Sequence, residues 1–530
     1  MTRRRVSAPR LLLLIIIAAA LGVGGVVGVQ WVQNAFASRA TPWFAGYVDA
    51  TATPDYAFET PTGTEEQNVV LSFVVADPDS PCTPSWGAAY TLDQASDSLD
   101  LDRRIALLRQ HGGDIAISFG GQANDELATV CTDQTSLEAA YRSVIDRYDV
   151  STIDVDVEGT ALENSASATL RAKTLAALQA EQRAAGKSLA IWLTLPVTPS
   201  GLSTDGQQVV KAMLDAGVDL AGVNAMTMDY GSSLGDQSLV DAGKSALVSL
   251  QRQLKALYTT ETDLTLSDAT LWSKVGATPM IGQNDVQDEV FTTDDAEAFN
   301  QMAVDLGIGR MSMWSLNRDQ TCGSNYVTLS VVSDACSGVD QGDASFAALL
   351  GATFTGSPQF SADQVTTSEP VATEAPDDPA TSPYQIWDEN AAYLQGTKVV
   401  WHHYVYEAKW WTSGDLPDNP VLNEWDTPWK LIGPVLPGET PVPVPTLPAG
   451  TYPDWSGSAV YNKGDRVLLD DVPYEAKWWT QGDSPEAASS DPDNSPWVAL
   501  TTDQIQKVLD GDGDSTTTPA PDGTTATPTP

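Results

Sequence analysis

The chain has 530 residues, which is too long for one ordinary domain and indicates three or four. It contains 28 basic and 70 acidic residues, so its formal net charge at pH 7 is −42. Because proteins bind nucleic acid by replacing counterions with Lys and Arg, this charge argues against a nucleic-acid partner and leaves a neutral or cationic polymer open as a substrate.

An apolar segment follows the basic N-terminus. Four arginines within the first ten residues precede a run without charge from Leu11 to Val29. This run is longer than an ordinary signal-peptide core and just long enough to span a bilayer, with the arginines on the cytoplasmic side. Ala35-Phe36-Ala37 is a small-residue cleavage pattern, so residues 1–37 are predicted to be a signal peptide that is removed on export. A retained signal anchor is the alternative; either way, the rest of the chain is predicted to be extracellular, as a secreted or membrane-anchored protein.

Between residues 41 and 353, short apolar runs alternate with longer helical patterns. The predicted strands are Trp43–Asp49, Val69–Ala76, Asp114–Phe119, Thr152–Glu158, Leu189–Pro196, Leu220–Met228, Val275–Ile281 and Arg310–Leu316. The predicted helices are Leu101–Gln110, Leu137–Arg147, Ala166–Ala185, Gly206–Ala216, Ser238–Leu257 and Ala296–Leu306. This alternation predicts an α/β fold, a parallel (β/α)8 TIM barrel. A doubly wound open sheet is the alternative, although it would normally use fewer strands, and no Gly-rich phosphate loop follows the first strand.

The fourth predicted strand carries three acids, Asp154, Asp156 and Glu158, on alternate residues. Successive side chains of a strand point to opposite faces, so the acids share one face at spacings of about 7 Å. A surface strand with its acids in water would show the same pattern. In a parallel barrel, however, reacting groups lie at the C-terminal ends of strands, and Glu158-Gly159 is such an end. We therefore predict a catalytic site here, in which crowded carboxylates share protons.

Other distinctive strand ends are expected at the same rim. The third strand ends in Ser118-Phe119-Gly120-Gly121, the sixth in Met226-Thr227-Met228-Asp229-Tyr230, and the eighth contains Trp314. The two glycines would let the backbone approach strand four or a ligand, although a simple strand-to-loop turn has the same pattern. Trp314 is either a core residue or the floor of a cleft.

The four cysteines are Cys82, Cys131, Cys322 and Cys336, an even number in a chain predicted to be exported. They predict disulfides rather than a metal site, because no CxxC motif or nearby histidine accompanies them. Chain order suggests the pairs Cys82–Cys131 and Cys322–Cys336, although three pairings are possible. No metal site is predicted.

Beyond the predicted barrel the composition changes and a repeat appears. The stretch Tyr406–Thr412, with the sequence YEAKWWT, returns at an offset of 68 residues as Tyr474–Thr480. The predicted segments are a catalytic domain (41–353), a Ser/Thr/Pro/acidic linker (354–383), two small all-β modules (384–432 and 452–500), a Pro-rich linker between them (433–451) and a disordered tail (501–530).

Adjacent tryptophans mark each module, Trp410 and Trp411 in the first and Trp478 and Trp479 in the second. So small a domain needs some tryptophans for its core, and adjacent residues in a strand face opposite ways. One tryptophan of each pair is therefore predicted to be exposed. A flat exposed ring suits stacking on sugar rings or on a Pro-rich peptide, and two tandem copies favour avidity on a repetitive polysaccharide.

These motifs resemble those of known families. Ser118–Gly121, Asp154–Glu158 and Met226–Tyr230 resemble the three signature strands of the family 18 glycoside hydrolases, the chitinases. The repeats resemble small chitin- and cellulose-binding modules of the type 5/12 carbohydrate-binding kind. The resemblance covers about residues 41–350 and 384–500.

The resemblance implies roles for the site residues. Glu158 would donate a proton to the glycosidic oxygen. Asp156 would orient the substrate acetamido group and share a proton with Glu158, with Asp154 behind it. Tyr230 would contact the acetamido oxygen, and Trp314 would lie under the scissile sugar. The other residues assigned to substrate binding are Met226, Asp229, Gly120, Gly121, Trp410, Trp411, Trp478 and Trp479.

Two positions depart from the family pattern. Ser151 stands where the strand-four pattern begins with Asp; because that position is a supporting one, activity is expected to survive. The strand-six pattern often reads Met-x-Tyr-Asp, which would place its Tyr at Met228, whereas here Tyr230 follows Asp229.

The sequence therefore predicts a secreted, monomeric chitinase that cleaves β-1,4 N-acetylglucosamine linkages by a retaining, substrate-assisted mechanism, with no cofactor and with chitin or a related polysaccharide as its partner. One alternative is a non-catalytic, lectin-like protein on an inactive barrel, against which the presence of Glu158 and Asp156 argues. A second is an endo-β-N-acetylglucosaminidase that cuts glycoprotein glycans, which two chitin-binding modules would not favour.

Overall fold

The computed structural model describes residues 41–510 apart from 263, 325, 327–330, 359–376, 380, 437, 440–446, 449, 470–471, 486–494 and 501. The predicted signal segment and most of the two predicted linkers lie outside the described residues. The chain divides into two compact units, Met1–Val371 and Ala372–Pro530. We call them the α/β unit and the C-terminal unit and describe each by itself.

The α/β unit is built on a parallel sheet that contains all eight predicted strands. Its strands are β1 (Trp43–Phe44), β2 (Gly46–Asp49), β3 (Asn68–Ala76), β6 (Asp114–Gly120), β7 (Thr152–Asp156), β8 (Ala190–Thr198), β10 (Leu220–Met226), β11 (Val275–Thr278) and β14 (Arg310–Met311). The first predicted strand is present in two pieces, β1 and β2, on either side of Ala45. β1 pairs with β14 and β2 pairs with β3, so this N-terminal segment has hydrogen-bonded neighbours on both sides.

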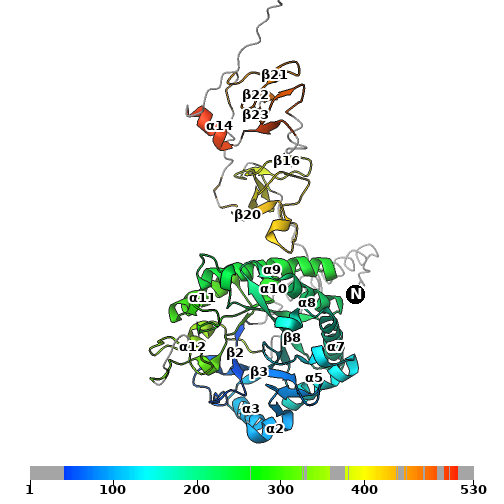
Figure 1. Ribbon diagram of the computed structural model, residues 1–530, viewed down its shortest axis with the longest axis vertical. Helices are drawn as coiled ribbons and strands as arrows, with labels where there is room; N and C mark the ends of the chain where they lie inside the picture. Colours follow the sequence, from blue (N-terminus) through cyan, green and yellow to red (C-terminus); the bar gives the residue numbers. More distant parts are fainter. Residues whose placement is uncertain are drawn as a thin grey trace, which may run out of the picture. The chain divides into compact units, whose positions relative to one another are not determined.

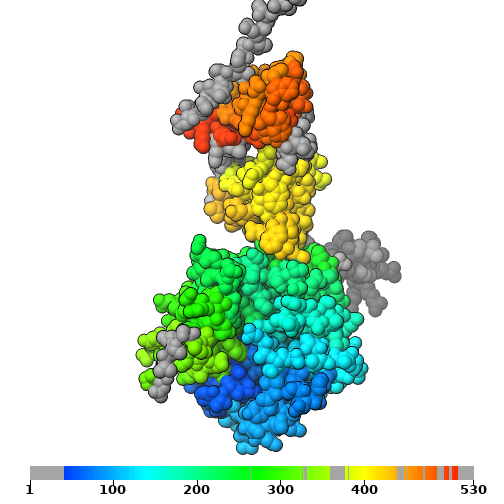
Figure 2. Space-filling view, viewed as in Figure 1, coloured from blue at the N-terminus to red at the C-terminus, as the bar shows by residue number. Residues whose placement is uncertain are grey.

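Helices cover the outer face of the sheet, as Figure 1 shows. The six predicted helices are present as α3 (Leu101–Gln110), α5 (Gln134–Tyr148), α7 (Ser165–Ala184), α8 (Thr204–Asp215), α9 (Leu239–Thr262) and α11 (Thr293–Leu306). Shorter helices are η1 (Thr64–Glu66), α2 (Leu92–Ser98), α4 (Leu127–Val130), α6 (Gly159–Leu162), η2 (Gly231–Ser233), α10 (Asp268–Ser273), η3 (Leu316–Arg318) and α12 (Phe346–Gly351). In α5, Leu137, Tyr141, Val144 and Tyr148 recur at helical spacing and are all buried, which is the pattern that fixes such a helix to a sheet. In the space-filling view, the cyan and teal segments form part of the surface of this unit, together with blue and green ones (Figure 2).

The connecting loops contain short strands and two disulfides. The additional strands are β4 (Pro84–Trp86), β5 (Tyr90–Thr91), β9 (Gly201–Leu202), β12 (Gly282–Gln283) and β13 (Val290–Phe291). The disulfides are Cys82–Cys131 and Cys322–Cys336, which confirms the pairing suggested by chain order.

The inner face of the sheet holds a cluster of aromatic and small side chains. Trp43, Tyr47 and Trp192 are buried there, with the rings of Trp43 and Trp192 edge to face at 5.9 Å. Small residues of neighbouring strands, such as Ala116 and Ala190, leave room for these rings. Phe73 and Trp314 pack against this cluster while remaining partly exposed.

The C-terminal unit has small, mainly antiparallel sheets in both regions predicted to be modules, which we call module 1 and module 2. Module 1 has β15 (Gln385–Ile386), β16 (Ala392–Tyr393), β17 (Lys398–Trp401), β18 (Tyr404–Ala408), β19 (Thr412–Ser413), η5 (Glu424–Asp426) and β20 (Trp429–Pro434). Module 2 has β21 (Val460–Tyr461), β22 (Arg466–Leu469), β23 (Val472–Ala476), β24 (Thr480–Gln481) and β25 (Trp497–Ala499). Trp429 and Trp497 are the equivalent core residues, and each donates its indole N–H to a backbone carbonyl, of Asp415 and Asp483 respectively.

The predicted disordered tail begins with a helix. Residues Thr502–Leu509 form α14, and Ile505 on this helix is buried, so the start of a segment that we predicted to be unstructured is helical. The remainder of that segment, 511–530, lies outside the described residues. None of the helices found in the described part of the chain has the length and apolar character that crossing a membrane requires.

Candidate active site

Asp154 and Asp156 of β7 and Glu158, two residues beyond the strand, lie on the inner side of the sheet, as the alternation predicted. Asp154 and Asp156 are buried and Glu158 is half-buried, while Ile153 and Val155 are buried on the opposite face. The strand ends at Asp156, and Glu158 keeps an extended backbone (φ −132°, ψ 170°) immediately before the short helix α6. The row therefore runs from the interior of the sheet to its C-terminal edge.

Asp154 is saturated with hydrogen-bond donors. Its Oδ2 accepts from the hydroxyls of Tyr47 (2.9 Å) and Ser118 (2.8 Å). Its Oδ1 accepts from the Thr194 hydroxyl (2.7 Å) and from Nη1 of Arg310 (2.5 Å). These donors come from β2, β6, β8 and β14, so the carboxylate joins four strands at the centre of the sheet.

Asp156, one step further along the strand, is in the opposite situation. Its Oδ1 is buried and has no hydrogen-bond partner, so it is a strong acceptor with nothing bound to it. Burial raises the pKa of Asp156 well above its ordinary value, the negative charges of Glu158 and Asp154 raise it further, and Arg310 opposes them.

Glu158 has the properties of a general acid. Burial raises the pKa of Glu158 to about 7, helped by the negative charges of Asp229 and Asp285. An acid with this pKa still holds its proton near neutral pH and can release it to a developing alkoxide.

The glycines that end β6 serve the backbone of β7. A Cβ atom on Gly120 would lie 2.0 Å from the carbonyl oxygen of Asp156, and Gly121 donates its N–H to the same oxygen (3.1 Å). A Cβ on Gly121 would meet the ring of Phe73 at 2.9 Å. Of the two interpretations of this pair, close backbone approach to strand four is the one the structure shows; neither glycine lines the adjoining cavity.

A cavity opens at the end of β7. Asp156 and Glu158 line it together with an aromatic wall formed by Tyr47, Phe73 and Trp314, and the rings of Phe73 and Trp314 stack at 5.5 Å. Its other lining residues are Gln122, Thr194, Met226, Met228, Asp229, Thr278, Met280 and Asp285. Predicted site residues from strands four, six and eight therefore meet in one space.

Tyr230 does not line this cavity. Its side chain is buried and its hydroxyl has no hydrogen-bond partner, while its backbone N–H donates to Glu289 Oε2 (3.0 Å). Burial, followed by the charge of Glu289, raises the pKa of Tyr230, so its hydroxyl stays protonated. Met228 lines the cavity instead, at the position where the family pattern often has its tyrosine. Tyr230 would have to become accessible before it could contact a substrate.

Several polar residues of the site were missed by the sequence reasoning. Asn224 on β10 donates to the hydroxyls of Thr194 (3.0 Å) and Thr278 (2.7 Å), which extends the hydrogen-bonded network around Asp154 across the sheet. Tyr47 and Arg310 bind Asp154 directly. One signal could have revealed them, because each is a polar side chain within an otherwise apolar predicted strand. Among the described residues, no group of three or more His, Cys, Asp or Glu is arranged to hold a metal ion.

The modules present exposed aromatic side chains. Trp410 is 45% exposed and Trp411 is less exposed, as predicted for the first pair, but in the second pair Trp478 (44%) and Trp479 (60%) are both exposed. The prediction of one exposed ring per pair is therefore wrong for module 2. In both modules the pair follows the end of a strand, β18 at Ala408 and β23 at Ala476, so the alternation on which the prediction rested applies to neither pair.

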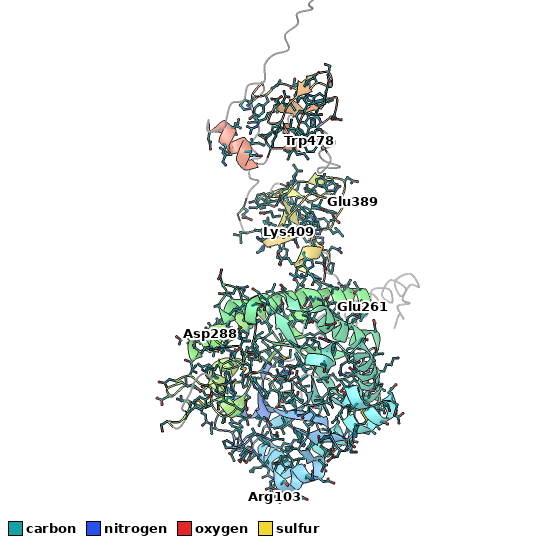
Figure 3. The ribbon with its side chains drawn as sticks, viewed as in Figure 1. Arg103, Glu261, Asp288, Glu389, Lys409 and Trp478 are labelled. Carbon is teal, nitrogen blue, oxygen red and sulfur yellow. A yellow bond between two sulfur atoms is a disulfide. The ribbon has the colours of Figure 1, made fainter. Side chains whose placement is uncertain are left out.

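Two further features accompany these rings. Trp425 of module 1 is 63% exposed and was not predicted. Lys409 and Trp478, labelled in Figure 3, belong to equivalent Lys–Trp pairs, in which Nζ lies 5.0 Å from the Trp410 ring in module 1 and 4.6 Å from the Trp478 ring in module 2. A cation over one face of a ring leaves its other face available to a ligand.

Comparison with known proteins gives matches to both units. Residues 454–498, within module 2, match the model of carbohydrate-binding module family 5/12. The chain is 36% identical over 294 residues to a probable bifunctional chitinase/lysozyme of Escherichia coli (strain K12), covering 53% of this chain and 31% of that protein. It is 36% identical over 257 residues to endochitinase 11 of Metarhizium anisopliae, covering 47% of each. The chain thus spans less than half the length of these curated relatives.

A solved structure is also similar. The catalytic domain of the hyperthermophilic chitinase from Pyrococcus furiosus is 26% identical, with a TM-score of 0.49, over 62% of this chain and 99% of that domain. The 36% identity to the two curated relatives makes the sequence of the α/β unit chitinase-like, and module 2 resembles a carbohydrate-binding module.

Proposed function

We propose that this protein is a chitinase that hydrolyses β-1,4 linkages between N-acetylglucosamine residues with retention of configuration. The observation that carries the proposal is the carboxylate row of β7, in which Asp156 has an unpartnered buried oxygen and Glu158, with a pKa of about 7, lines a cavity with an aromatic wall. The 36% identity to a probable bifunctional chitinase/lysozyme and to an endochitinase supports the substrate class.

In the proposed first step, the acetamido carbonyl oxygen of the sugar attacks its own anomeric carbon. The bond from that carbon to the leaving oxygen breaks, and the proton of Glu158 goes to the leaving oxygen. Asp156 accepts the hydrogen bond of the acetamido N–H through its unpartnered Oδ1 and balances the positive charge of the oxazolinium that forms. Such substrate assistance replaces the second carboxylate nucleophile of most glycosidases.

In the second step, Glu158 is a carboxylate and takes a proton from water. That water attacks the anomeric carbon from the side of the departed sugar, the bond from the acetamido oxygen breaks, and the starting configuration is restored. The proton lost by Glu158 in the first step is thereby regained, so no external acid or base is consumed.

The geometry supports a role for the aromatic wall in holding a sugar. Trp314 lines the cavity and is supported by Phe73 and Tyr47, whose ring centroids lie 5.5 and 6.0 Å from its own. A flat apolar surface of this kind suits the apolar face of a pyranose ring. Tyr230, buried beside Glu289, is proposed to contact the acetamido oxygen only if the substrate displaces the side chains that cover it.

The wider organisation proposed for this protein is that of a secreted enzyme on a polymer. The eight parallel strands are proposed to close into a barrel, since β1–β2 bonds to β14 on one side and to β3 on the other. Two disulfides suit an oxidising compartment outside the cell. The exposed tryptophans of both modules are proposed to hold the enzyme, as a monomer, on insoluble chitin, so that each module raises the local concentration of the other.

The experiment that tests the activity is release of soluble N-acetylglucosamine oligomers from insoluble chitin. The wild-type protein is expected to release them and Glu158→Gln is not. Glu163→Gln is the matched control, because it makes the same chemical change at an exposed position just after α6. Absence of product with the wild type, or an unchanged rate for Glu158→Gln, would contradict the proposal. Binding to chitin without any product would instead indicate a lectin-like protein.

A further inference from the structure

Arg310 is a buried cation at the inner end of the carboxylate row. It is the first residue of β14, and its side chain is 1% exposed. Its Nη1 donates to Asp154 Oδ1 (2.5 Å), its Nη2 to the Tyr47 hydroxyl (3.0 Å) and its Nε to Ser312 Oγ (2.9 Å). Three rings surround the guanidinium, with centroids 5.1, 5.6 and 5.5 Å from Cζ, those of Trp43, Tyr47 and Trp192.

The pair formed by Arg310 and Asp154 cannot touch a substrate in the cavity. Neither side chain lines that space, whereas Asp156 and Glu158 do. A contribution to stability does not by itself explain a buried ion pair, because replacing such a pair by apolar residues of similar volume is often neutral or stabilising. The position of the pair instead favours an effect on the neighbouring carboxyl groups of Asp156 and Glu158.

Four donors surround the carboxylate of Asp154. Each oxygen accepts two hydrogen bonds, and one of the four donors is a full positive charge. We propose, on the basis of the hydrolytic function proposed above, that Arg310 is a positioning residue whose positive charge, held in place by Asp154 and Tyr47, acts on the neighbouring Asp156 and favours the anion of that carboxyl.

The titratable groups around Asp156 make this effect strong. Those that face the carboxylates are Asp154 and Glu158 on the same segment, Arg310 on β14, the neutral Tyr47 on β2, and Asp229 and Asp285, which follow β10 and β12. The flanking strands β6 and β8 contribute the uncharged Ser118, Gly120 and Thr194. Arg310 is thus the positive charge that acts on Asp156 against several negative ones, and it lowers the pKa of that carboxyl.

Removal of this charge has a defined consequence. Asp154 and Asp156 would become two neighbouring anions in a buried space, and like charges so close share a proton. Asp156 would then be protonated at a higher pH, at which it can no longer balance the charge of the oxazolinium. The acidic limb of the kcat/KM profile reports the protonation of the group that must be ionised in the free enzyme.

The test compares pH profiles of kcat/KM on a soluble chitooligosaccharide for the wild type and four variants. Arg310→Met is expected to move the acidic limb upward by about one pH unit, the size expected for loss of an opposite charge beside a carboxylate. Arg310→Lys restores the charge without the paired hydrogen bonds, so its limb is expected near that of the wild type even where kcat falls. If Arg310 merely filled space, Arg310→Met would lower activity or stability and leave the acidic limb of the profile unchanged.

The two remaining variants make the test independent of whether Arg310→Met folds. Asp154→Asn leaves Arg310 with no counter-charge, so the acidic limb is expected to move downward. Asp154→Asn combined with Arg310→Met removes both charges, and its limb is expected to return toward that of the wild type. If Asp154→Asn has the same acidic limb with and without Arg310→Met, Arg310 does not act on Asp156 and the inference is wrong.

A second measurement separates this inference from the proposed function. In protein labelled with 13C at Asp side-chain carboxyls, the Asp156 resonance is the one lost in Asp156→Asn. Its titration midpoint is expected at a higher pH in Arg310→Met than in the wild type and at a lower pH in Asp154→Asn, because the first change removes a positive charge and the second a negative one. Equal midpoints in all three proteins would overturn the inference even if chitin is hydrolysed, and midpoints that move in these opposite directions would support it even if chitin is not.

Discussion

The two units of this protein place their polar and aromatic residues in opposite ways. In the α/β unit, ionisable groups such as Asp154, Asp156 and Arg310 are buried. Side chains of neighbouring strands donate hydrogen bonds to Asp154. In the C-terminal unit, large aromatic rings such as Trp425 and Trp479 are exposed. Catalysis needs proton affinities that differ from those in water, which burial, neighbouring charges and hydrogen bonds provide. Binding to a flat polymer needs accessible apolar surface, which burial would remove.

The comparison predicts that the two units fail separately. Glu158→Gln is expected to lower kcat on a soluble chitooligosaccharide by about 10³-fold, because it removes the proton donor and little else. Chitin binding by the same variant, measured by depletion from solution onto insoluble chitin, is expected to be unchanged. If this variant also failed to bind chitin, binding and catalysis would share one site, and the division of labour between the two units would be wrong.

The converse change lies in module 2. Trp478→Ala with Trp479→Ala is expected to weaken binding to insoluble chitin by roughly tenfold or more. The reason is that both exposed rings, which would be buried against the polymer on binding, are removed. Hydrolysis of the soluble oligomer is expected to stay within about twofold of the wild type. Leu431→Ala, which removes another exposed apolar side chain from the same unit, is the control and should bind normally. Equal chitin retention by the double variant would exclude the stacking mechanism.

A pH measurement sharpens the role of burial and charge in the α/β unit. Glu158 acts as an acid and must be protonated, so kcat/KM is expected to fall as the pH rises through about 7, the pKa of Glu158. The negative charge of Asp229 helps to raise this pKa, so Asp229→Asn is expected to move the alkaline limb to lower pH by a fraction of a unit. Asn suits the left-handed backbone of this position (φ 52°) and keeps an acceptor for the N–H of Val286.

The control for this shift is Asp288→Asn. Asp288, labelled in Figure 3, is exposed, also has a positive φ, and does not contribute to the pKa of Glu158. Its profile should match that of the wild type. An alkaline limb that moves equally in both variants would mean that general surface charge, rather than Asp229 in the cavity wall, sets the acidity of Glu158.

The smallest predicted effect concerns module 1. Trp425→Ala is expected to weaken chitin binding by a few-fold, since module 2 still holds the polymer and the loss appears mainly through reduced avidity. In the background of the double variant of module 2, the same change is expected to have a larger effect. If Trp425→Ala has no effect in either background, this exposed ring is not part of the binding surface.

The arrangement of the α/β unit could be predicted from the sequence to a large extent. Apolar runs separated by helical patterns located all eight strands, and the alternation of acids in Asp154–Glu158 placed them on one face of β7. Both signals are local and repeat at the period of the element, so they survive without knowledge of the neighbours. The disulfide pairing followed from chain order because the linked cysteines are close to one another in sequence.

The environment of each acid could not be predicted in this way. Asp154 and Asp156 have the same sequence signal, yet one is bound by donors from four strands and the other has a free oxygen. Arg310 is 156 residues from Asp154, and nothing in its local sequence indicates which residue it contacts. The second tryptophan pair shows the same limit, since both of its rings are exposed although its local sequence repeats that of the first pair.

The sequence by itself thus determined which elements form, which face of β7 carries the acids and where the aromatic residues concentrate, because hydrophobic periodicity and composition are properties of short segments. Only the tertiary structure decided which acid is saturated, which is free to share a proton and which rings remain exposed. Those properties depend on hydrogen bonds, burial and charge supplied by segments far apart in the chain, and a buried carboxyl responds to the sum of all of them.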